Sequence, residues 1–208
     1  MKPHQRHFTV AIFGSARIRE ADPVYEQIDK LARLIAEEHM DVVTGGGPGL
    51  MDAASKGHQE GRTGNGTLSV GLNIRLPKEQ KFNSHLDIKK EFSRFSSRLD
   101  AFMDLADAVV VAPGGVGTLL EFFYTWQLAQ VREIGNVPII LIGNMWPDFM
   151  TWLKRWPLRE NLISKKDLDN IFLAGGVEEA MGIIRKIRSR RRPDLEPARG
   201  VRRKDIWD

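Results

Sequence analysis

A glycine-rich turn followed by an acidic residue is the part of this sequence whose residue types could do chemistry. Residues 108–121 read AVVVAPGGVGTLLE, so a β-branched apolar run ends at Pro113 and three glycines precede Thr118 and Glu121. A strand, a glycine turn and a helix N-terminus present free backbone N–H groups and the positive end of the helix dipole, which together bind anions. A carboxylate one turn into that helix therefore predicts chemistry on a phosphorylated substrate.

Thr118 and Glu121 also allow a purely structural interpretation. The spacing Thr-x-x-Glu is that of a capping box, in which the Glu side chain bonds back to the backbone of the capping residue. These residues by themselves leave both interpretations open.

Two further glycine turns follow apolar runs, at Gly14-Ser15 and at residues 45–49. The second does not fit the dinucleotide pattern G-x-G-x-x-G, because Leu50 stands where the last glycine belongs, and the chain has no phosphate-binding G-x-x-x-x-G-K-[ST] motif. A plain turn between a strand and a helix is the simpler interpretation. Three consecutive glycines, at Gly45, Gly46 and Gly47, favour close approach of the backbone to a ligand.

Strands and helices that alternate along the chain must position these turns. We expect strands at residues 8–13, 41–44, 67–72, 87–92, 108–112, 138–142 and 170–173, and helices at 22–39, 50–57, 93–105, 118–132, 146–156 and 177–188. This order predicts a single-domain, Rossmann-like α/β fold: a doubly wound, mainly parallel sheet with helices on both faces. The three glycine turns should then meet beyond the carboxyl ends of the strands.

The length and composition of the chain are those of a globular protein with one domain. The chain has 208 residues, 42% hydrophobic and 28% charged, which suits one globular domain. It has no cysteine, which excludes disulfides and thiolate metal sites and fits a cytoplasmic protein. No apolar run is long enough for a signal segment or a membrane span, so we expect no membrane partner. The five His lack metal-ligand spacing, so we expect no metal.

The basic charge is concentrated at the C-terminus. The formal charge is +4, and ten Lys and Arg against four Asp and Glu lie within residues 185–208. We therefore expect a nucleotide-binding domain over residues 1–188 and a basic, disordered tail over 189–208.

The sequence resembles the LOG-like family, nucleoside 5′-monophosphate phosphoribohydrolases once labelled "lysine decarboxylase". Residues 113–121, PGGVGTLLE, match the family motif P-G-G-x-G-T-x-x-E. Residues 45–51 resemble the family's second glycine signature, 13–15 its first-strand turn, and 125–127 the continuation of the motif helix. The resemblance covers roughly residues 8–181.

The resemblance implies a pair of catalytic residues, Arg98 and Glu121. From its position alone, Arg98 would be interpreted as a solvated or surface-paired side chain early in its helix. Leu99 follows Arg98 where plant cytokinin-activating members have Lys, which argues against a cytokinin-specific role. The implied reaction is hydrolysis of the N-glycosidic bond of a nucleoside 5′-monophosphate to the free base and ribose 5-phosphate, with no cofactor or metal.

Each candidate residue has an expected role in that reaction. Glu121 stabilises an oxocarbenium-like sugar or activates water, and the Arg98 cation orients this carboxylate and keeps it ionised. Thr125, one helical turn after Glu121, contacts the ligand. The other expected substrate-binding residues hold the phosphate or line the pocket: Ser15, Gly45, Gly46, Gly47, Gly114, Gly115, Val116, Gly117 and Thr118. Base contacts are expected from the loop at residues 75–83.

The motif helix also predicts a partner. Phe122, Phe123, Tyr124 and Trp126 occupy most of its circumference, so it needs a second burial partner besides the sheet. We expect a homodimer or a higher homo-oligomer, as the resemblance also implies, in which part of the base pocket comes from the partner subunit.

Two other functions remain possible for such a chain. The same fold serves non-catalytic carriers of nucleotides or of the molybdenum cofactor, which would need neither Arg98 nor Glu121. Nucleic-acid binding, as in related DNA-processing proteins, is supported only by the basic segment at residues 185–192, whose charges lack interleaved aromatic residues.

Overall fold

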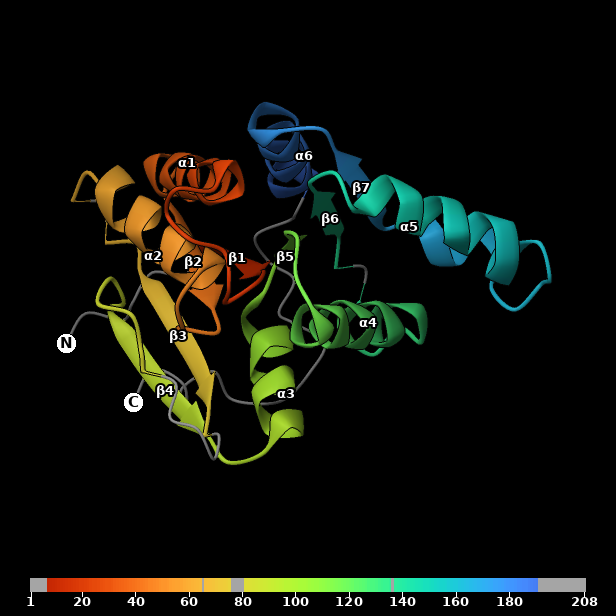
Figure 1. Cartoon of the computed structure of the whole chain (residues 1–208), viewed down its shortest axis with the longest axis horizontal. Helices are drawn as coiled ribbons and strands as arrows, with labels where there is room; N and C mark the ends of the chain where they lie inside the picture. The colour runs from red at the N-terminus through yellow and green to blue at the C-terminus, as the bar shows by residue number, and fades with distance from the viewer. Residues whose placement is uncertain (1–6, 65, 76–80, 136, 191–208) are drawn as a thin grey trace.

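The computed structural model describes residues 7–64, 66–75, 81–135 and 137–190, and within them it contains one seven-stranded sheet (Figure 1). All six strand pairings are parallel, in the order β4-β3-β2-β1-β5-β6-β7. The strands are β1 (Phe8–Phe13), β2 (Met40–Thr44), β3 (Ser69–Ile74), β4 (Ile88–Phe92), β5 (Ala108–Val111), β6 (Ile139–Ile142) and β7 (Ile171–Ala174). The predicted strand order along the chain is confirmed.

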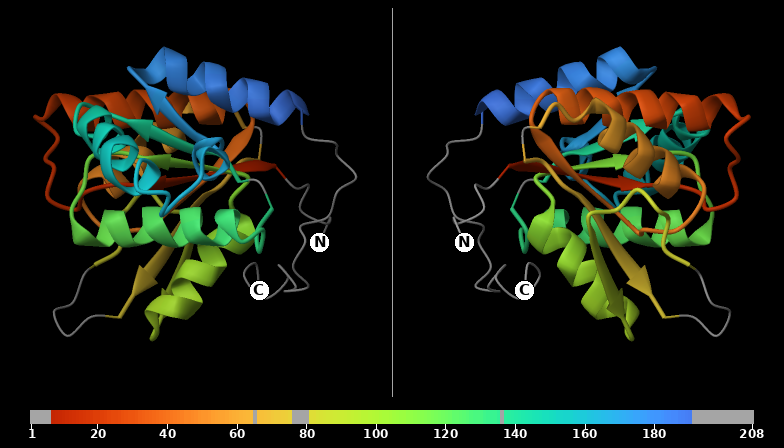
Figure 2. Two further views of the ribbon diagram at one scale, coloured as in Figure 1. Left: turned by 90° about the vertical axis from the view of Figure 1, so that its right-hand side faces the viewer. Right: turned by 90° about the vertical axis from the view of Figure 1, so that its left-hand side faces the viewer.

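Six α-helices of the described residues cover the two faces of this sheet. They are α1 (Pro23–Glu37), α2 (Leu50–Gly61), α3 (Phe95–Leu105), α4 (Val116–Gln130), α5 (Trp146–Leu153) and α6 (Val177–Arg190). Figure 2 shows α1 and α6 on one side of the sheet and α3 and α4 on the other. The fold is therefore the predicted Rossmann-like, doubly wound one.

The alternation of side chains along buried strands divides the core into two layers. In β1, Val10 and Ile12 pack with α1, α2 and α6, whereas Ala11 and Phe13 pack with α3, α4 and α5. Successive residues of a strand point to opposite faces, so a strand covered on both sides must be apolar throughout. This explains the uninterrupted run of Ala and Val in β5.

Several helix boundaries differ from the predicted ones, and α2 ends at Gly61, four residues later than expected. The chain enters α4 at Val116, two residues early. Arg94 rather than Ser93 is the N-cap of α3, and its side chain makes no capping bond. After α5 the chain continues as a π-helical turn, η1 (Lys154–Leu158), which contains Pro157. Proline has no N–H for a helical hydrogen bond, so the regular α-helix ends before it.

The C-terminal helix holds part of the basic segment. Arg185 donates to Glu38 at 2.6 Å and Arg188 donates to the Glu38 carbonyl at 2.6 Å, so both arginines fasten α6 to the end of α1. The helix runs to Arg190, two residues beyond the expected domain boundary, and residues 191–208 of the expected tail lie outside the described residues. Within the described ranges, no helix combines the length and the apolar character needed to cross a membrane.

Candidate active site

The three glycine turns lie together at the carboxyl edge of the sheet. Ser15 joins them, because its N–H donates to the Pro113 carbonyl at 3.1 Å and its carbonyl accepts from the Leu50 N–H at 2.9 Å. The Ser15 hydroxyl accepts from the Arg17 N–H at 3.1 Å. A Cβ on Gly14 would lie 2.9 Å from Leu50 and 3.3 Å from Ala112, so the first turn passes closely between the other two.

The N-terminus of α4 is open to an anion. Gly115 is the N-cap and makes no side-chain capping bond. The N–H groups of Val116, Gly117 and Thr118 therefore begin the helix without intrahelical acceptors. Val116 is 85% exposed, and a Cβ on Gly115 or Gly117 would meet nothing within 4 Å, so a ligand can approach this end.

Gly114 is required for a different reason. A Cβ at this position would overlap the Thr118 side chain, which is buried against the turn. Gly114 thus lets the chain fold back over the first turn of α4. Gly115 and Gly117 leave the N–H groups of that turn accessible.

The capping-box interpretation of Thr118 and Glu121 is wrong. Thr118 is the third residue of α4 rather than its N-cap. The Glu121 carboxylate accepts from the Arg98 Nη2 at 2.6 Å, an ion pair between α4 and α3.

Arg98 and Glu121 form a buried ion pair, and each side chain keeps only 10% of its surface exposed. The Arg98 Nε donates to the Leu72 carbonyl of β3 at 2.8 Å, and its guanidinium lies 5.2 Å from the centroid of the Phe102 ring. The surface interpretation of Arg98 is therefore wrong. The bond to the Leu72 carbonyl and the contact with the Phe102 ring fix the direction in which the guanidinium meets the carboxylate.

Burial raises the pKa of Glu121 above the ordinary value of a glutamate, and the charge and hydrogen bond of Arg98 oppose this rise. The expected influence of Arg98 on the ionisation of this carboxyl is present, but burial is the larger effect. A carboxylate with a raised pKa is a stronger base than an exposed one, which suits it to accept a proton from water.

The turn after β2 forms a wall beside this pair. A Cβ on Gly45 would lie 2.9 Å from the Arg98 Nη2 and 2.7 Å from the Met51 sulfur, so a larger residue would displace the guanidinium or the thioether. Gly46 has a φ of +72° and its N–H donates to the Thr44 hydroxyl at 3.0 Å. The turn at Gly47 continues into α2 through Gly49, which has a φ of +71°.

Thr125 is fully buried one turn beyond Glu121, and its hydroxyl donates to the Glu121 carbonyl at 2.8 Å. This bond holds the backbone of Glu121 in place. A contact between Thr125 and a ligand stays a prediction.

Several residues of the site escaped the sequence analysis. The Leu72 carbonyl anchors Arg98, and Asn83 bonds the turn at 45–47, but neither has a sequence signal of its own. Residues 76–80 of the expected base-contacting loop lie outside the described residues. Across the described ranges, no three His, Asp or Glu side chains gather in a group that could hold a metal ion.

The structure also has a cavity of about 550 Å³ away from this edge. It lies between the C-terminal end of α4 and the segment before β7, and its walls include Arg132, Ser164, Lys166 and Asp169. None of the candidate site residues lines it.

A doubly wound parallel sheet with glycine turns at its carboxyl edge defines a Rossmann-like α/β protein. The family described as "Possible lysine decarboxylase" matches residues 51–184. The chain belongs to this family, which is the LOG family indicated by the motif at residues 113–121.

Individual relatives are more distant. A pyrimidine/purine nucleotide 5′-monophosphate nucleosidase of Escherichia coli (strain K12) is 27% identical over 147 residues, or 64% of this chain. The chain spans about 30% of the length of that relative.

Solved structures match over a larger share of the chain. A structural-genomics target, TM1055, has a TM-score of 0.66 at 25% identity over 86% of this chain and 99% of its own. The molybdenum cofactor binding protein of the phototrophic bacterium Rippkaea orientalis has a TM-score of 0.64 at 22% identity, over 88% of this chain and 98% of its own, which shows a common fold.

Proposed function

We propose that this protein hydrolyses the N-glycosidic bond of a nucleoside 5′-monophosphate, giving the free base and ribose 5-phosphate. The observation that carries this proposal is the buried Arg98–Glu121 ion pair, which lies one turn into a helix whose N-terminus is uncapped. The name of the nucleosidase relative from Escherichia coli supports the same class of reaction.

In α4, the groups that would bind the phosphate and the carboxylate that would act on the sugar lie at different positions along the helix. The N–H groups of residues 116–118 would hold the 5′-phosphate at the positive end of the helix dipole. Glu121 lies on the same face as Thr118, about 4.5 Å further along the helix axis. A ribose ring bound by its phosphate would span this distance and bring its anomeric carbon to the carboxylate.

The reaction then needs a carboxylate and a water molecule. The bond between the anomeric carbon and the base nitrogen breaks, and the base leaves with the bonding electron pair and takes up a proton. Glu121 stabilises the cationic sugar and accepts a proton from the water that forms the new bond to the anomeric carbon. Arg98 positions Glu121 and limits the rise in its pKa.

Ligand binding without chemistry is the second candidate, because glycine turns and an open helix N-terminus also suit a carrier. The shared fold of the molybdenum cofactor binding protein favours this alternative. A carrier would not need a buried carboxylate held by an arginine, which costs desolvation of two charges.

Nucleic-acid binding has weaker support from the described residues. Arg185 and Arg188, two of the basic residues at 185–192, bond to Glu38, the residue that follows α1. The remaining part of that segment beyond Arg190 lies outside the described residues.

A nucleotide panel with Glu121→Gln tests the proposal. The purified protein is incubated with nucleoside 5′-monophosphates of each base, and ribose 5-phosphate release is measured. We expect release by the wild type and a loss of about 100-fold or more in Glu121→Gln, since the amide cannot accept the proton. Glu26→Gln, an exposed position on α1, serves as the matched control and should act as wild type.

Two other outcomes would contradict the proposal. Tight nucleotide binding with no release from any nucleotide would favour a carrier. Equal release by the wild type and Glu121→Gln would remove the carboxylate from the chemistry.

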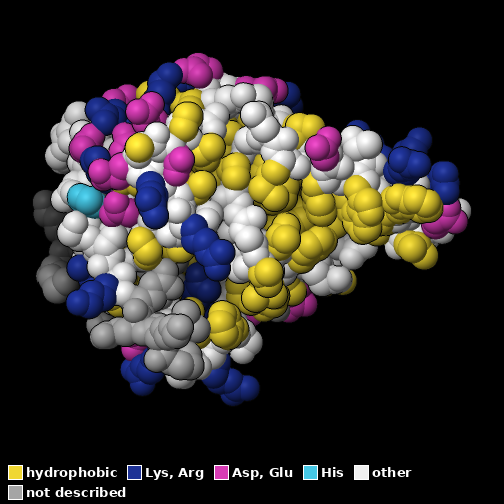
Figure 3. Space-filling view, viewed as in Figure 1, with side chains coloured by type: hydrophobic (Ala, Val, Ile, Leu, Met, Phe, Trp, Pro, Cys, Tyr) yellow, Lys and Arg dark blue, Asp and Glu magenta, His cyan; other side chains and the backbone are white. Residues whose placement is uncertain are grey.

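We further propose that the active protein is a homodimer built on α4 and α5. Glu121 is the one charged residue of α4 and it is buried, so the exposed face of this helix carries no charge. Leu120 and Phe123 on that face are 44% and 42% exposed, and Trp152 on α5 is 51% exposed. Figure 3 shows hydrophobic side chains gathered over α4 and α5.

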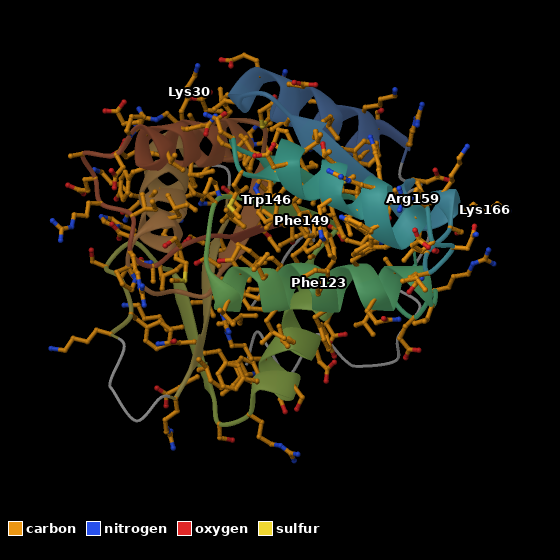
Figure 4. The ribbon with its side chains drawn as sticks, turned by 45° about the vertical axis from the view of Figure 1, so that its right-hand side comes forward. Lys30, Phe123, Trp146, Phe149, Arg159 and Lys166 are labelled. Atoms are coloured by element: carbon orange, nitrogen blue, oxygen red, sulfur yellow. The ribbon has the colours of Figure 1, made fainter. Side chains whose placement is uncertain are left out.

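Aromatic rings connect the two helices of this apolar face. Phe123 of α4 and Phe149 of α5 lie next to one another (Figure 4), with ring centroids 5.9 Å apart. Phe149 also stacks on Trp152 of α5. A second copy of the chain is the occupant that a continuous apolar face of this kind fits. Since Leu120 adjoins Glu121, the partner would lie close to the candidate site.

A further inference from the structure

The segment just before β4 is fastened to the turn at residues 45–47. Asn83 makes the main contacts: its N–H donates to the Gly46 carbonyl at 2.8 Å, and its Nδ2 donates to the Gly47 carbonyl at 3.0 Å. Its Oδ1 accepts from the His85 N–H at 3.1 Å, which closes a turn within the segment. The Nδ2 also donates to the Ser55 hydroxyl at 3.4 Å, so the side chain uses both its amide nitrogen and its amide oxygen.

These bonds satisfy the carbonyls of two buried glycines. Gly46 and Gly47 are buried, and an unpaired buried carbonyl costs about 1–3 kcal/mol. Side chains from the same segment close the other side of the turn. A Cβ on Gly46 would lie 2.9 Å from the Phe82 ring and 3.2 Å from Leu86. The segment therefore determines where the turn lies.

The same turn touches the catalytic pair. A Cβ on Gly45 would lie 2.9 Å from the Arg98 Nη2, the atom that donates to Glu121. Gly46 in turn packs on β3, where a Cβ on Gly46 would lie 3.0 Å from the Gly71 Cα. Leu72, the next residue of β3, accepts from the Arg98 Nε. Arg98 is thus enclosed between β3 and a turn that Asn83 fixes.

We propose that Asn83 is a positioning residue for the reaction. By fixing the carbonyls of Gly46 and Gly47, it holds the glycine turn against the Arg98 guanidinium and so sets the place of the Glu121 carboxylate. This inference rests on the proposed hydrolase function for its kinetic consequences. Its structural consequence, a loosened Arg98, does not depend on that function.

Asn83→Asp removes the Nδ2 donor, which bonds the Gly47 carbonyl and, at the longer distance of 3.4 Å, the Ser55 hydroxyl. The carboxylate keeps the size of the side chain and the acceptor for His85, but it has no N–H for the Gly47 carbonyl and repels it. We expect kcat to fall about tenfold, because a small displacement of a catalytic group is costly, with KM nearly unchanged. The acidic limb of the kcat/KM profile should move to higher pH, since a looser Arg98 opposes the rise in the Glu121 pKa less.

Asn170→Ala is the matched control. Asn170 is buried at the opposite edge of the sheet, before β7, and its Nδ2 donates to the Val137 carbonyl at 3.1 Å. Its removal breaks a bond of the same kind, so thermal stability should fall while kcat, KM and the pH profile stay those of the wild type. Asn83→Ala is the second variant if Asn83→Asp does not fold.

Hydrogen exchange at the Arg98 Nε–H, followed by NMR, gives a readout that needs no activity. We expect faster exchange in Asn83→Asp and the wild-type rate in Asn170→Ala. Wild-type exchange together with unchanged kinetics in both Asn83 variants would overturn the positioning role. Faster exchange in a protein that releases no ribose 5-phosphate from any nucleotide would keep the positioning role and reject the proposed function.

Discussion

At the scale of single residues, Arg98 and Glu121 show how tertiary contacts give two ordinary side chains a defined chemistry. Moving both charges out of water is costly, and their attraction offsets this cost only where further hydrogen bonds satisfy the remaining polar atoms. Here the Leu72 carbonyl supplies such a bond to Arg98. As a result, burial raises the pKa of the Glu121 carboxyl, and the charge of Arg98 limits this rise.

A second buried titratable residue, His58, should make stability depend on pH. Its ring is fully buried in α2, with Nε2 donating to the Met40 carbonyl at 3.0 Å and Nδ1 without a partner among the described residues. Burial lowers the pKa of His58 from 6.5 to about 4. The unfolded chain therefore binds a proton first as the pH falls, and the free energy of unfolding decreases between about pH 6.5 and pH 4.

Urea unfolding near pH 7 and near pH 4.5 measures this effect. We expect His58 to account for a loss of about 2–3 kcal/mol between these conditions. His58→Gln cannot titrate, so its free energy of unfolding should decrease less over the same range. Parallel pH dependences in the two proteins would contradict the shifted pKa.

At the scale of elements, α1 and α2 pack through two glycines. Cβ atoms on Gly57 and Gly61 of α2 would overlap the backbone carbonyl oxygens of Asp29 and Arg33 in α1. Glycines four residues apart lie on one face of a helix, so the two backbones meet along a smooth strip. This close packing places the N-terminus of α2 and the glycine turn before it.

Gly57→Ala tests the packing of this helix pair. The added methyl group must push α1 and α2 apart, and we expect a loss of about 3 kcal/mol in the free energy of unfolding. Gly182→Ala on the exposed face of α6, where a Cβ meets nothing within 4 Å, is the control. It should raise stability by about 0.5–1 kcal/mol, because alanine favours a helix. Equal effects at both positions would exclude the close packing.

At the scale of the whole molecule, the apolar face on α4 and α5 should govern assembly. Size-exclusion chromatography with light scattering is expected to give a dimer for the wild type. Phe123→Glu and Trp152→Glu each place a charge on that face and should shift the mass to that of a monomer. Lys30→Glu on α1 changes a charge away from the face and should stay dimeric. A monomeric wild type, or unchanged mass in both variants, would reject this interface.

The sequence by itself determined the strands, most helices and the glycine turns. Local patterns specify them: a short, β-branched apolar run followed by a proline is typical of a strand buried on both faces, and β5 ends at Val111, just before Pro113. Helix ends were less well predicted, because Gly115 and Arg94 act as N-caps without side-chain capping bonds, so no residue type marks these ends.

Only the tertiary structure decided which side chains of the site meet. Glu121 fits a capping box as well as an active site in sequence, and Arg98 fits a solvated surface. Their contact joins residues 23 apart in the chain, and the contact of Asn83 with Gly47 joins residues 36 apart. Such contacts depend on how β3, α3 and α4 stack on one sheet edge, and the local preferences of a segment carry no information about partners that distant.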